Sequence, residues 1–305
     1  MDRKIDNQIK KFTHSNINTS YLQNFDENLD ITQLKKELIK YFSISISIDR
    51  LGLSYINQKD TEKHYFENME KPLKDYKDFT ADSVITMKDL GAQISRKLVY
   101  TLEYIGPLII ISYKYFDLFT EVDEITYGQH ALFFANLFHF ARRIYESNYV
   151  HIFSKRTMPL ICLFINCFYY WILYACLCGH YIFNSDYKDY FKSNKIKFFA
   201  TLFYIKSEMK NMNCHSILRR IKYFKKGEKD IPKGEGFEII TCANYFWEFL
   251  SWCLLCVIAF HWSIVLFTCC GFFIMRSWAL KKHNKLKKLH KDYEKDRFAF
   301  IPGIA

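Results

Sequence analysis

The sequence predicts a helical membrane protein in which about six transmembrane helices follow a small α+β domain. Two observations support this fold class. Residues 1–90 carry 14 basic and 15 acidic side chains, whereas residues 91–305 carry 29 and 17. The second part also holds nearly all of the long apolar runs. This pattern indicates a soluble domain, residues 1–92, ahead of a membrane domain, residues 93–305, with basic loops.

The averages over the whole chain hide this division. Mean hydropathy is −0.14, which at face value suggests an ordinary soluble protein. Net charge is +11, which suggests a nucleic-acid binder. The excess positive charge falls on the membrane part, where it can meet anionic headgroups or a phosphate-rich ligand. We therefore expect no nucleic-acid partner.

The N-terminal part shows one clear helix. Apolar residues fall at positions 31, 34, 38, 39 and 42, which is helical spacing. Asp30 can cap this helix, and Gln33 completes a capping-box variant. Short strands are expected within residues 46–53 and at Ser83–Met87, and a helix with several strands is compatible with a β-grasp domain. The first twenty residues are polar, so we expect no signal peptide and a cytosolic domain.

The membrane part contains six apolar segments. They cover residues 97–116, 131–149, 158–183, 196–208, 240–259 and 262–280. A span needs about 20 residues, so the fourth segment is short. The connection 117–130 has four acids and no Lys or Arg, whereas the connections 141–157 and 209–235 and the tail from residue 276 are basic. The positive-inside rule then places both termini and the basic loops in the cytosol.

Several kinds of site can be excluded from the sequence. Eight of the ten cysteines lie in apolar runs, where we expect them to pack between helices. Cys253 and Cys256 form a single CxxC pair without a second one, so we expect no metal site. Histidine boxes of a di-iron enzyme and a GxSxG elbow do not occur, and Gly234 and Gly236 lack the third glycine of a Rossmann fingerprint.

A polar face interrupts the apolar run at 240–259. Asn244 and Glu248 are four residues apart, so they share one face of a helix, and Tyr245 lies beside them. Ionisable groups in apolar spans are costly and suggest function. This face can hold a polar cofactor head with Tyr245 as proton donor. It can equally be a hydrogen-bonded tie between two helices.

Two further groups carry charge at the cytosolic ends of spans. Asn211, His215, Arg219 and Lys222 recur at helical spacing and form a polar stripe that ends in cations. Such a stripe can accept phosphates through charge-assisted hydrogen bonds, or it can be a solvated helix at the membrane surface. The second group contains His139, Arg142, Arg143 and Glu146, and its alternative interpretation is a set of cations that extend to the membrane surface. Lys281, Lys282 and His283 form a similar basic cluster in the tail.

These motifs together resemble a known family, the very-long-chain trans-2-enoyl-CoA reductases of the endoplasmic reticulum, within the steroid 5α-reductase superfamily. The resemblance spans residues 88 to 283. It is carried by KDLGAQIS (88–95), LEYIGPL (102–108), RRIYESNYVHIFSKRTMPL (142–160), NMNCHSILRRIK (211–222), IPKGEGFEIITCANYFWE (231–248) and MRSWALKKH (275–283). The N-terminal part is similar in size and element order to the family's ubiquitin-like domain.

The resemblance implies a function and its site residues. It implies NADPH-dependent reduction of a long-chain trans-2-enoyl-CoA, the last step of fatty-acid elongation, in a multi-pass protein of the endoplasmic reticulum membrane with other elongation enzymes as partners. Tyr245 matches the proposed proton donor of the family. Residues matching cofactor-binding positions are Asn211, His215, Arg219, Lys222, Asn244, Glu248, Lys282 and His283, and residues assigned to substrate binding are His139, Arg143 and Glu103.

The chain departs from the family pattern at four positions. Phe140 stands where relatives usually have Tyr, and Ile152 stands where they have Arg or Lys. Leu286 replaces a common Tyr, and Lys222 replaces Arg and so loses the bidentate fork. Phe140 and Ile152 remove a hydroxyl and a cation from a region expected to face the substrate. These two departures are compatible with an altered substrate range or with a loss of activity.

Three alternatives to the enoyl-CoA reductase are therefore retained. The first is a related reductase acting on a 3-oxo-steroid or a polyprenal, which the ubiquitin-like part and the TMP and CANY motifs disfavour. The second is a membrane methyltransferase using S-adenosylmethionine, against which the cationic stripe argues, because a sulfonium ligand needs no phosphate cradle. The third is a catalytically degenerate scaffold of the elongation complex.

Overall fold

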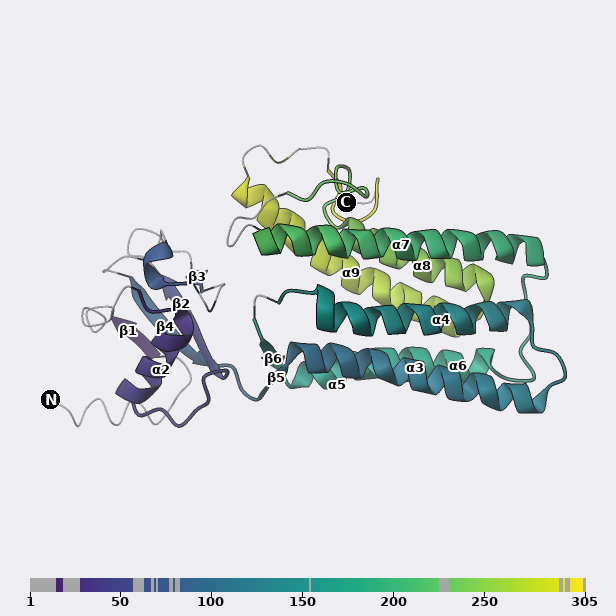
Figure 1. Ribbon diagram of the computed structural model, residues 1–305, viewed down its shortest axis with the longest axis horizontal. Helices are drawn as coiled ribbons and strands as arrows, with labels where there is room; N and C mark the ends of the chain where they lie inside the picture. Colours follow the sequence, from purple (N-terminus) through teal and green to yellow (C-terminus); the bar gives the residue numbers. More distant parts are fainter. Residues whose placement is uncertain are drawn as a thin grey trace. The chain divides into compact units, whose positions relative to one another are not determined.

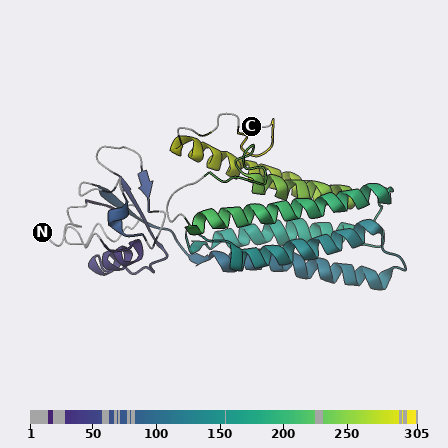
Figure 2. The same ribbon diagram turned by 45° about the horizontal axis from the view of Figure 1, so that its top comes forward.

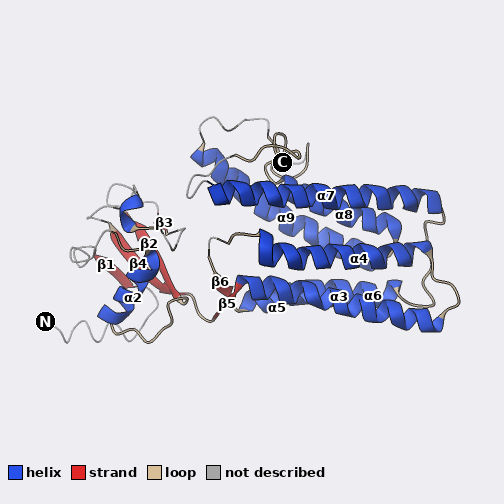
Figure 3. Cartoon of the chain, viewed as in Figure 1, coloured by secondary structure: helices blue, strands red, loops and turns tan. Residues whose placement is uncertain are grey.

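The computed structural model describes residues 15–18, 28–56, 63–66, 69, 71–76, 79, 83–153, 155–224, 231–290, 293 and 297–303. The contacts within the chain form two compact units. One comprises residues 1–98 together with 153–162, and the other comprises 99–152 together with 163–305. The first contains the strands and the second is helical (Figure 3).

The first unit contains a four-stranded antiparallel sheet in the order β1-β4-β2-β3. Its strands are β1 (Ser15–Asn18), β2 (Leu51–Ile56), β3 (Lys63–Tyr65) and β4 (Val84–Asp89), joined by helix α2 (Ile31–Tyr41) and the short turn η2 (Leu73–Asp75) (Figure 1). The predicted capping box of Asp30 and Gln33 is present. The apolar stripe of α2 packs with the inner residues of β2 and β4, which confirms an α+β region. The assignment of this α+β region as a β-grasp domain stays a prediction.

A second, two-stranded ribbon also belongs to the first unit. β5 (Gln93–Ser95) pairs antiparallel with β6 (Thr157–Pro159), with Ile94 opposite Met158. The backbone hydrogen bond from Arg96 N to Arg156 O, 3.0 Å long, continues the ribbon, and Arg96 Nε donates to Thr157 O at 3.0 Å. The sequence motifs DLGAQIS and TMP, which lie about sixty residues apart, are thus the two halves of one ribbon.

The second unit is a set of long helices that run lengthwise beside one another in both views (Figures 1 and 2). They are α3 (Arg96–Glu121), α4 (Tyr127–Tyr145), α5 (Ile161–Cys167), α6 (Leu177–Ile182), α7 (Asn194–Phe224), α8 (Ala243–Ile258) and α9 (Trp262–Leu289), with π-helical segments η3 (Glu146–Val150) and η4 (Phe168–Cys176). Their core is rich in aromatic side chains, among them Tyr104, Phe140, Tyr174, Trp252 and Phe267. Helix α3 admits Trp171 only because residue 106 is glycine, since a Cβ there would overlap the indole ring.

Among the residues that the structure describes, two stretches are long and apolar enough to cross a membrane. They are Ile161–Ile182, which α5, η4 and α6 form together, and Trp262–Leu289. They match the predicted spans 158–183 and 262–280. The predicted count of six is not confirmed: α8 is apolar but has 16 residues, and the predicted span 196–208 is the middle of the 31-residue helix α7.

Candidate active site

Buried charges join α4 to α7. Arg142 lies on α4 and donates from Nη1 to Glu146 Oε1 at 2.7 Å, from Nη1 to Asn211 Oδ1 at 2.8 Å and from Nε to Glu208 Oε2 at 3.1 Å. The three partners and Arg142 itself are buried. Charges in such surroundings persist only when they are paired and hydrogen-bonded. Arg142 is therefore the centre of the polar network that holds the two helices together.

A histidine and two asparagines extend this network to α8. His139 Nδ1 lies 3.1 Å from Glu208 Oε1 on α7, and its Nε2 lies 3.5 Å from Glu248 Oε1 on α8. Asn211 donates from Nδ2 to the backbone oxygen of Asn244 at 2.7 Å. The sequence-predicted residues His139, Asn211, Asn244 and Glu248 are thus brought into one cluster.

Helix α3 joins the same cluster through Arg143. This side chain donates to the Tyr104 hydroxyl at 2.9 Å, to Glu146 Oε2 at 2.8 Å and to His215 Nε2 at 3.1 Å. Its guanidinium also lies over the Tyr104 ring, 5.2 Å from the centroid. Glu103, the neighbour of Tyr104, is buried and accepts a hydrogen bond from Asn166 Nδ2 at 2.6 Å. The three residues assigned to substrate binding therefore lie in this network or next to it.

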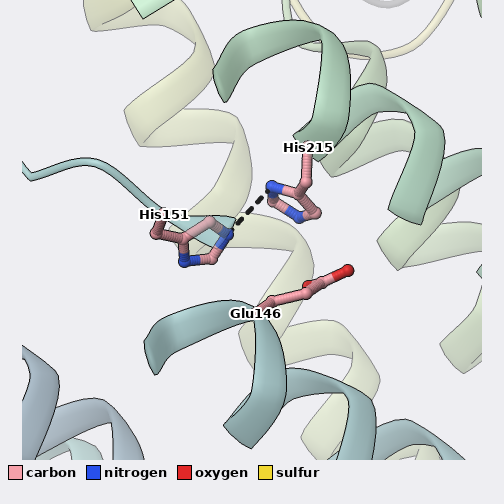
Figure 4. A group of neighbouring side chains, drawn as sticks. All are labelled: Glu146, His151 and His215. Atoms are coloured by element: carbon pink, nitrogen blue, oxygen red, sulfur yellow. Dashed lines mark hydrogen bonds between the residues drawn. The ribbon is translucent and has the colours of Figure 1, made fainter. Parts of the chain in front are cut away.

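Glu146, His151 and His215 come close enough to suggest a metal site (Figure 4). Their hydrogen bonds argue against one. Arg143 can only donate, so His215 Nε2 must accept and the proton of this ring lies on Nδ1. That N–H faces His151 Nε2 at 3.2 Å, and both oxygens of Glu146 are held by guanidinium groups. His215 Nδ1 therefore offers no lone pair to a metal ion, and the two rings form a directional hydrogen-bond chain.

The chain of hydrogen bonds requires both rings to be neutral. Burial lowers the pKa of His151 to about 4, and the positive charge of Arg143 acts in the same direction. Burial and Arg143 also hold the pKa of His215 well below its ordinary value. A second proton on His151 Nε2 would point at the N–H of His215 and break their hydrogen bond.

We expect this pair to make the folded protein sensitive to acid. The folded chain takes up the His151 proton only near pH 4, whereas the unfolded chain takes it up near its ordinary pKa of 6.5. Neutral His151 makes its full contribution to the stability of the folded protein above pH 6.5. This contribution is lost as the pH falls towards 4, because the unfolded state binds more protons than the folded state in that range. Thermal unfolding of the detergent-solubilised protein between pH 7.5 and 5 measures this effect. The melting temperature of His151→Asn should depend less steeply on pH than that of the wild type. Equal slopes of melting temperature against pH for the variant and the wild type would contradict the expectation.

Four buried atoms of the cluster have no hydrogen-bond partner within the described part of the chain. They are His139 Nε2, Arg142 Nη2, Arg143 Nε and Asn244 Oδ1. Buried polar atoms in folded proteins are nearly always partnered. Arg142 Nη2 still lies 3.0 Å from Glu208 Oε2. The other two nitrogens, on α4, and the amide oxygen on α8 are therefore available to polar groups of a ligand.

The other predicted cofactor residues lie elsewhere. Arg219 is exposed on α7, and the exposed Lys222 donates to Ile152 O at 2.5 Å. Lys282 on α9 is partly buried. His283 is buried, and its Nδ1 lies 2.6 Å from Thr241 Oγ1. Arg219 and Lys282 can reach a phosphate, whereas His283 is already engaged with Thr241 inside the protein.

Tyr245 lies at the start of α8, against an apolar cluster. It packs with Cys242, Met275, Ala279 and Phe300. Its hydroxyl makes no hydrogen bond to any residue that the structure describes, and the side chain is partly exposed. The hydroxyl is therefore free to donate a proton, but the structure does not bring it into the Arg142 network.

The C-terminal segment fixes the chain just before Tyr245. Phe298 N donates to Ile239 O at 2.9 Å, Thr241 N donates to Phe298 O at 2.8 Å, and Cys242 N donates to Ala299 O at 3.2 Å. Thr241 Oγ1 also contacts the Tyr293 hydroxyl. The residues just before α8 are thus hydrogen-bonded both to the backbone of Phe298 and Ala299 and to the side chain of Tyr293.

Comparison with known proteins places this arrangement in a family. A very-long-chain enoyl-CoA reductase of Dictyostelium discoideum is 34% identical over 228 residues, which cover 73% of this chain and 75% of that protein. A protein of Caenorhabditis elegans named as a probable very-long-chain enoyl-CoA reductase is 31% identical over 239 residues, 73% of this chain and 76% of the relative. The chain belongs to the very-long-chain enoyl-CoA reductase family. The family description 3-oxo-5-alpha-steroid 4-dehydrogenase also matches residues 156–305.

The reductase fold explains how the departure at Phe140 is accommodated. Phe140 is fully buried and packs among aromatic rings, with centroids 5.8 Å from Tyr174 and 6.3 Å from both Tyr104 and Trp252. Of these neighbours, Tyr104 belongs to the charged network, because Arg143 holds its hydroxyl. Ile152 directly follows His151 in the chain, and its backbone oxygen accepts a hydrogen bond from Lys222 Nζ.

Two residues of the reductase network do not stand out from the sequence as anchors. Arg142 enters the sequence analysis only as one cation of a group, and Glu208 does not enter it. Glu208 precedes Asn211 by three residues and His215 by seven, so it continues the polar stripe of α7 by one turn into the apolar run. An acid at that position inside an apolar stretch is the available signal.

Proposed function

We propose that this chain is an NADPH-dependent reductase of long-chain trans-2-enoyl-CoA, the last step of fatty-acid elongation. One observation supports it above the others. Some of the family's cofactor and substrate positions, on α3, α4, α7 and α8, meet in a single buried network that contains polar atoms without a hydrogen-bond partner. Buried polar atoms without a hydrogen-bond partner are costly, and a bound ligand can satisfy them.

The available side chains fit NADPH in part. Asn244 Oδ1, Glu248 and His139 Nε2 offer hydrogen bonds to a polar head, and Asn211 and His215 support them. Arg219, Lys222 and Lys282 supply cations for phosphates. His283 does not fit this role, because its ring is buried against Thr241. NADPH would supply the hydride for C3 of the enoyl group.

The chain's own residues would manage charge and the proton. Reduction at C3 would build negative charge on the thioester oxygen, and a guanidinium such as that of Arg143 would stabilise this charge. The Tyr245 hydroxyl, which has no described hydrogen-bond partner, would then donate its proton to C2. Glu103, beside the Arg143-bound Tyr104, would contact the substrate.

Exposed apolar side chains support a membrane-embedded bundle of about six spans. On α3, Ile109, Tyr113, Phe116 and Phe119 are each 60–64% exposed. Similar exposed residues lie on α4 and α7, among them Phe134, Phe138, Phe199 and Phe203. Contiguous apolar surface of this kind marks a contact with lipid or a partner. We place the protein in the endoplasmic reticulum membrane with both termini and a ubiquitin-like domain in the cytosol, beside other elongation enzymes.

Purified full-length protein in detergent tests the proposal. We expect consumption of NADPH with a long-chain trans-2-enoyl-CoA and formation of the saturated acyl-CoA, detected by absorbance and mass spectrometry. The match to the 3-oxo-5-alpha-steroid 4-dehydrogenase description makes a 3-oxo-steroid and a polyprenal the comparison substrates. Turnover of only those compounds would replace the proposal with the related reductase. NADPH binding without turnover of any of them would also reject it, and no NADPH binding would indicate a scaffold.

A further inference from the structure

Glu208 has the least accessible carboxylate of the network. Its side chain is 0% exposed, that of His139 is 2% exposed, and that of Glu248 is 12% exposed. The three side chains therefore form a line that runs from the interior of α7, through α4, to the accessible side of α8. Of these three, Glu248 at the end of the line is the most open to a ligand.

The carboxylate of Glu208 fixes the orientation of the His139 ring. A carboxylate only accepts hydrogen bonds, so the His139 nitrogen that faces it, Nδ1 at 3.1 Å, carries a proton. Arg142 holds the same carboxylate from the other side, with Nη2 3.0 Å from Oε2. If the ring turned over, Cδ2–H would replace Nδ1–H in front of the carboxylate, and the hydrogen bond to Glu208 would be lost. His139 Nε2 is therefore directed at Glu248.

The His139 ring is in contact with both carboxylates. Its Nδ1 is bound to Glu208, and its Nε2 lies 3.5 Å from Glu248 Oε1. A change in the orientation of the ring would therefore move the group that faces Glu248, so Glu208 influences Glu248 through His139.

We propose that Glu208 is a positioning residue of the reductase, acting through His139 on Glu248. This inference rests on the proposed function, in which Glu248 contacts the cofactor. Glu208 itself touches no ligand. Its removal should disturb the site through His139, so that the effects of replacing the two residues overlap.

A double-mutant cycle between Glu208→Gln and His139→Gln tests this inference in the full-length protein. The glutamine side chain keeps the shape of glutamate and lacks its charge. We expect kcat to fall about 100-fold in either single variant, since small misplacements of reacting groups cost that much. The double variant should be no slower than His139→Gln alone. If the fold reductions in kcat of the two single variants multiply in the double variant, the inference is overturned, because independent contributions behave in this way.

A matched control separates positioning from general loss of structure. Asp189 and Lys197 form another ion pair in the same unit, with the Lys197 side chain 1% exposed. Lys197 precedes Glu208 by eleven residues on α7, which is about 16 Å along a helix. Asp189→Asn should lower the melting temperature and leave kcat per folded molecule unchanged. A melting shift in Glu208→Gln without a change in kcat would reduce Glu208 to a structural ion pair.

The positioning role can be tested separately from the identity of the substrate. If the wild-type protein binds NADPH but turns over no enoyl-CoA, the proposed function fails, and the same cycle is measured as the dissociation constant of NADPH. Changes in the free energy of NADPH binding that are non-additive between the two variants support the positioning role, and additive changes reject it. If Glu208→Gln does not fold, Glu208→Asp, which keeps the charge one methylene further away, replaces it in the cycle.

Discussion

Arg142→Met should lower the free energy of unfolding by about 3–5 kcal/mol, the largest stability effect that we expect for a single side chain in this protein. Arg142 binds Glu146, Glu208 and Asn211 at once in a buried network. Methionine fills a similar volume, but it leaves two carboxylates with less compensation and an amide oxygen without its donor. The cost is therefore that of uncompensated polar groups, with little contribution from a cavity.

Chemical unfolding in mild detergent, followed by tryptophan fluorescence, measures this loss. Arg220, next to the exposed Arg219, is also exposed, and Arg220→Met provides the matched control. We expect the control to change stability by no more than about 0.5 kcal/mol. A loss below about 1 kcal/mol for Arg142→Met would mean that the carboxylates do not depend on this guanidinium.

Tyr245→Phe should lower kcat by about 100-fold to 10,000-fold, the usual contribution of a general acid. The substitution removes one hydroxyl that bonds to none of the described residues, and the ring remains packed against the apolar cluster that contains Cys242 and Phe300. Binding of NADPH and the melting temperature should therefore stay close to those of the wild type. Steady-state kinetics with the enoyl-CoA, together with direct NADPH titration, separate these quantities.

The control for Tyr245 is another tyrosine with an ordinary structural hydroxyl. Tyr169 donates to Phe267 O at 3.2 Å, so Tyr169→Phe should cost about 1 kcal/mol of stability and no activity. A Tyr245→Phe enzyme as fast as the wild type would remove this tyrosine from the mechanism. In that case the proton at C2 would have to come from the buried network or from water.

Local signals in the sequence are sufficient for some elements and not for others. The capping box at Asp30 and the apolar spacing of α2 are set by residues within one or two turns, and the structure has the helix at Ile31–Tyr41. The pairing of Gln93–Ser95 with Thr157–Pro159 cannot be predicted from periodicity, because it joins short segments far apart in the chain. Hydropathy locates two of the spans among the described residues. It does not determine the limits of α7, because an apolar part and a cationic part follow each other within this one helix.

The candidate site shows the same limit. Helical spacing alone places Asn244 with Glu248 and Asn211 with His215, because each pair lies on one helix. The contacts between helices, such as Arg143 with His215 and His139 with Glu208, depend on how α4 packs against α7. No residue pattern within either helix specifies that packing. Tyr245 illustrates the converse, because a residue selected by its motif lies against an apolar cluster.

The β5–β6 ribbon has a consequence for the order of folding. It pairs residues separated by about sixty positions, so the chain between them must be brought back before the strands can meet, at an entropic cost that grows with loop length. Within that loop, Tyr115 of α3 stacks on Phe133 of α4 with centroids 3.8 Å apart, a contact between nearer parts of the chain. We expect the α3–α4 hairpin to form first and the ribbon to close late. A change at Ile94 or Met158 should then act mainly on the rate of unfolding, so the ribbon governs how long the folded protein persists more than how quickly it is reached.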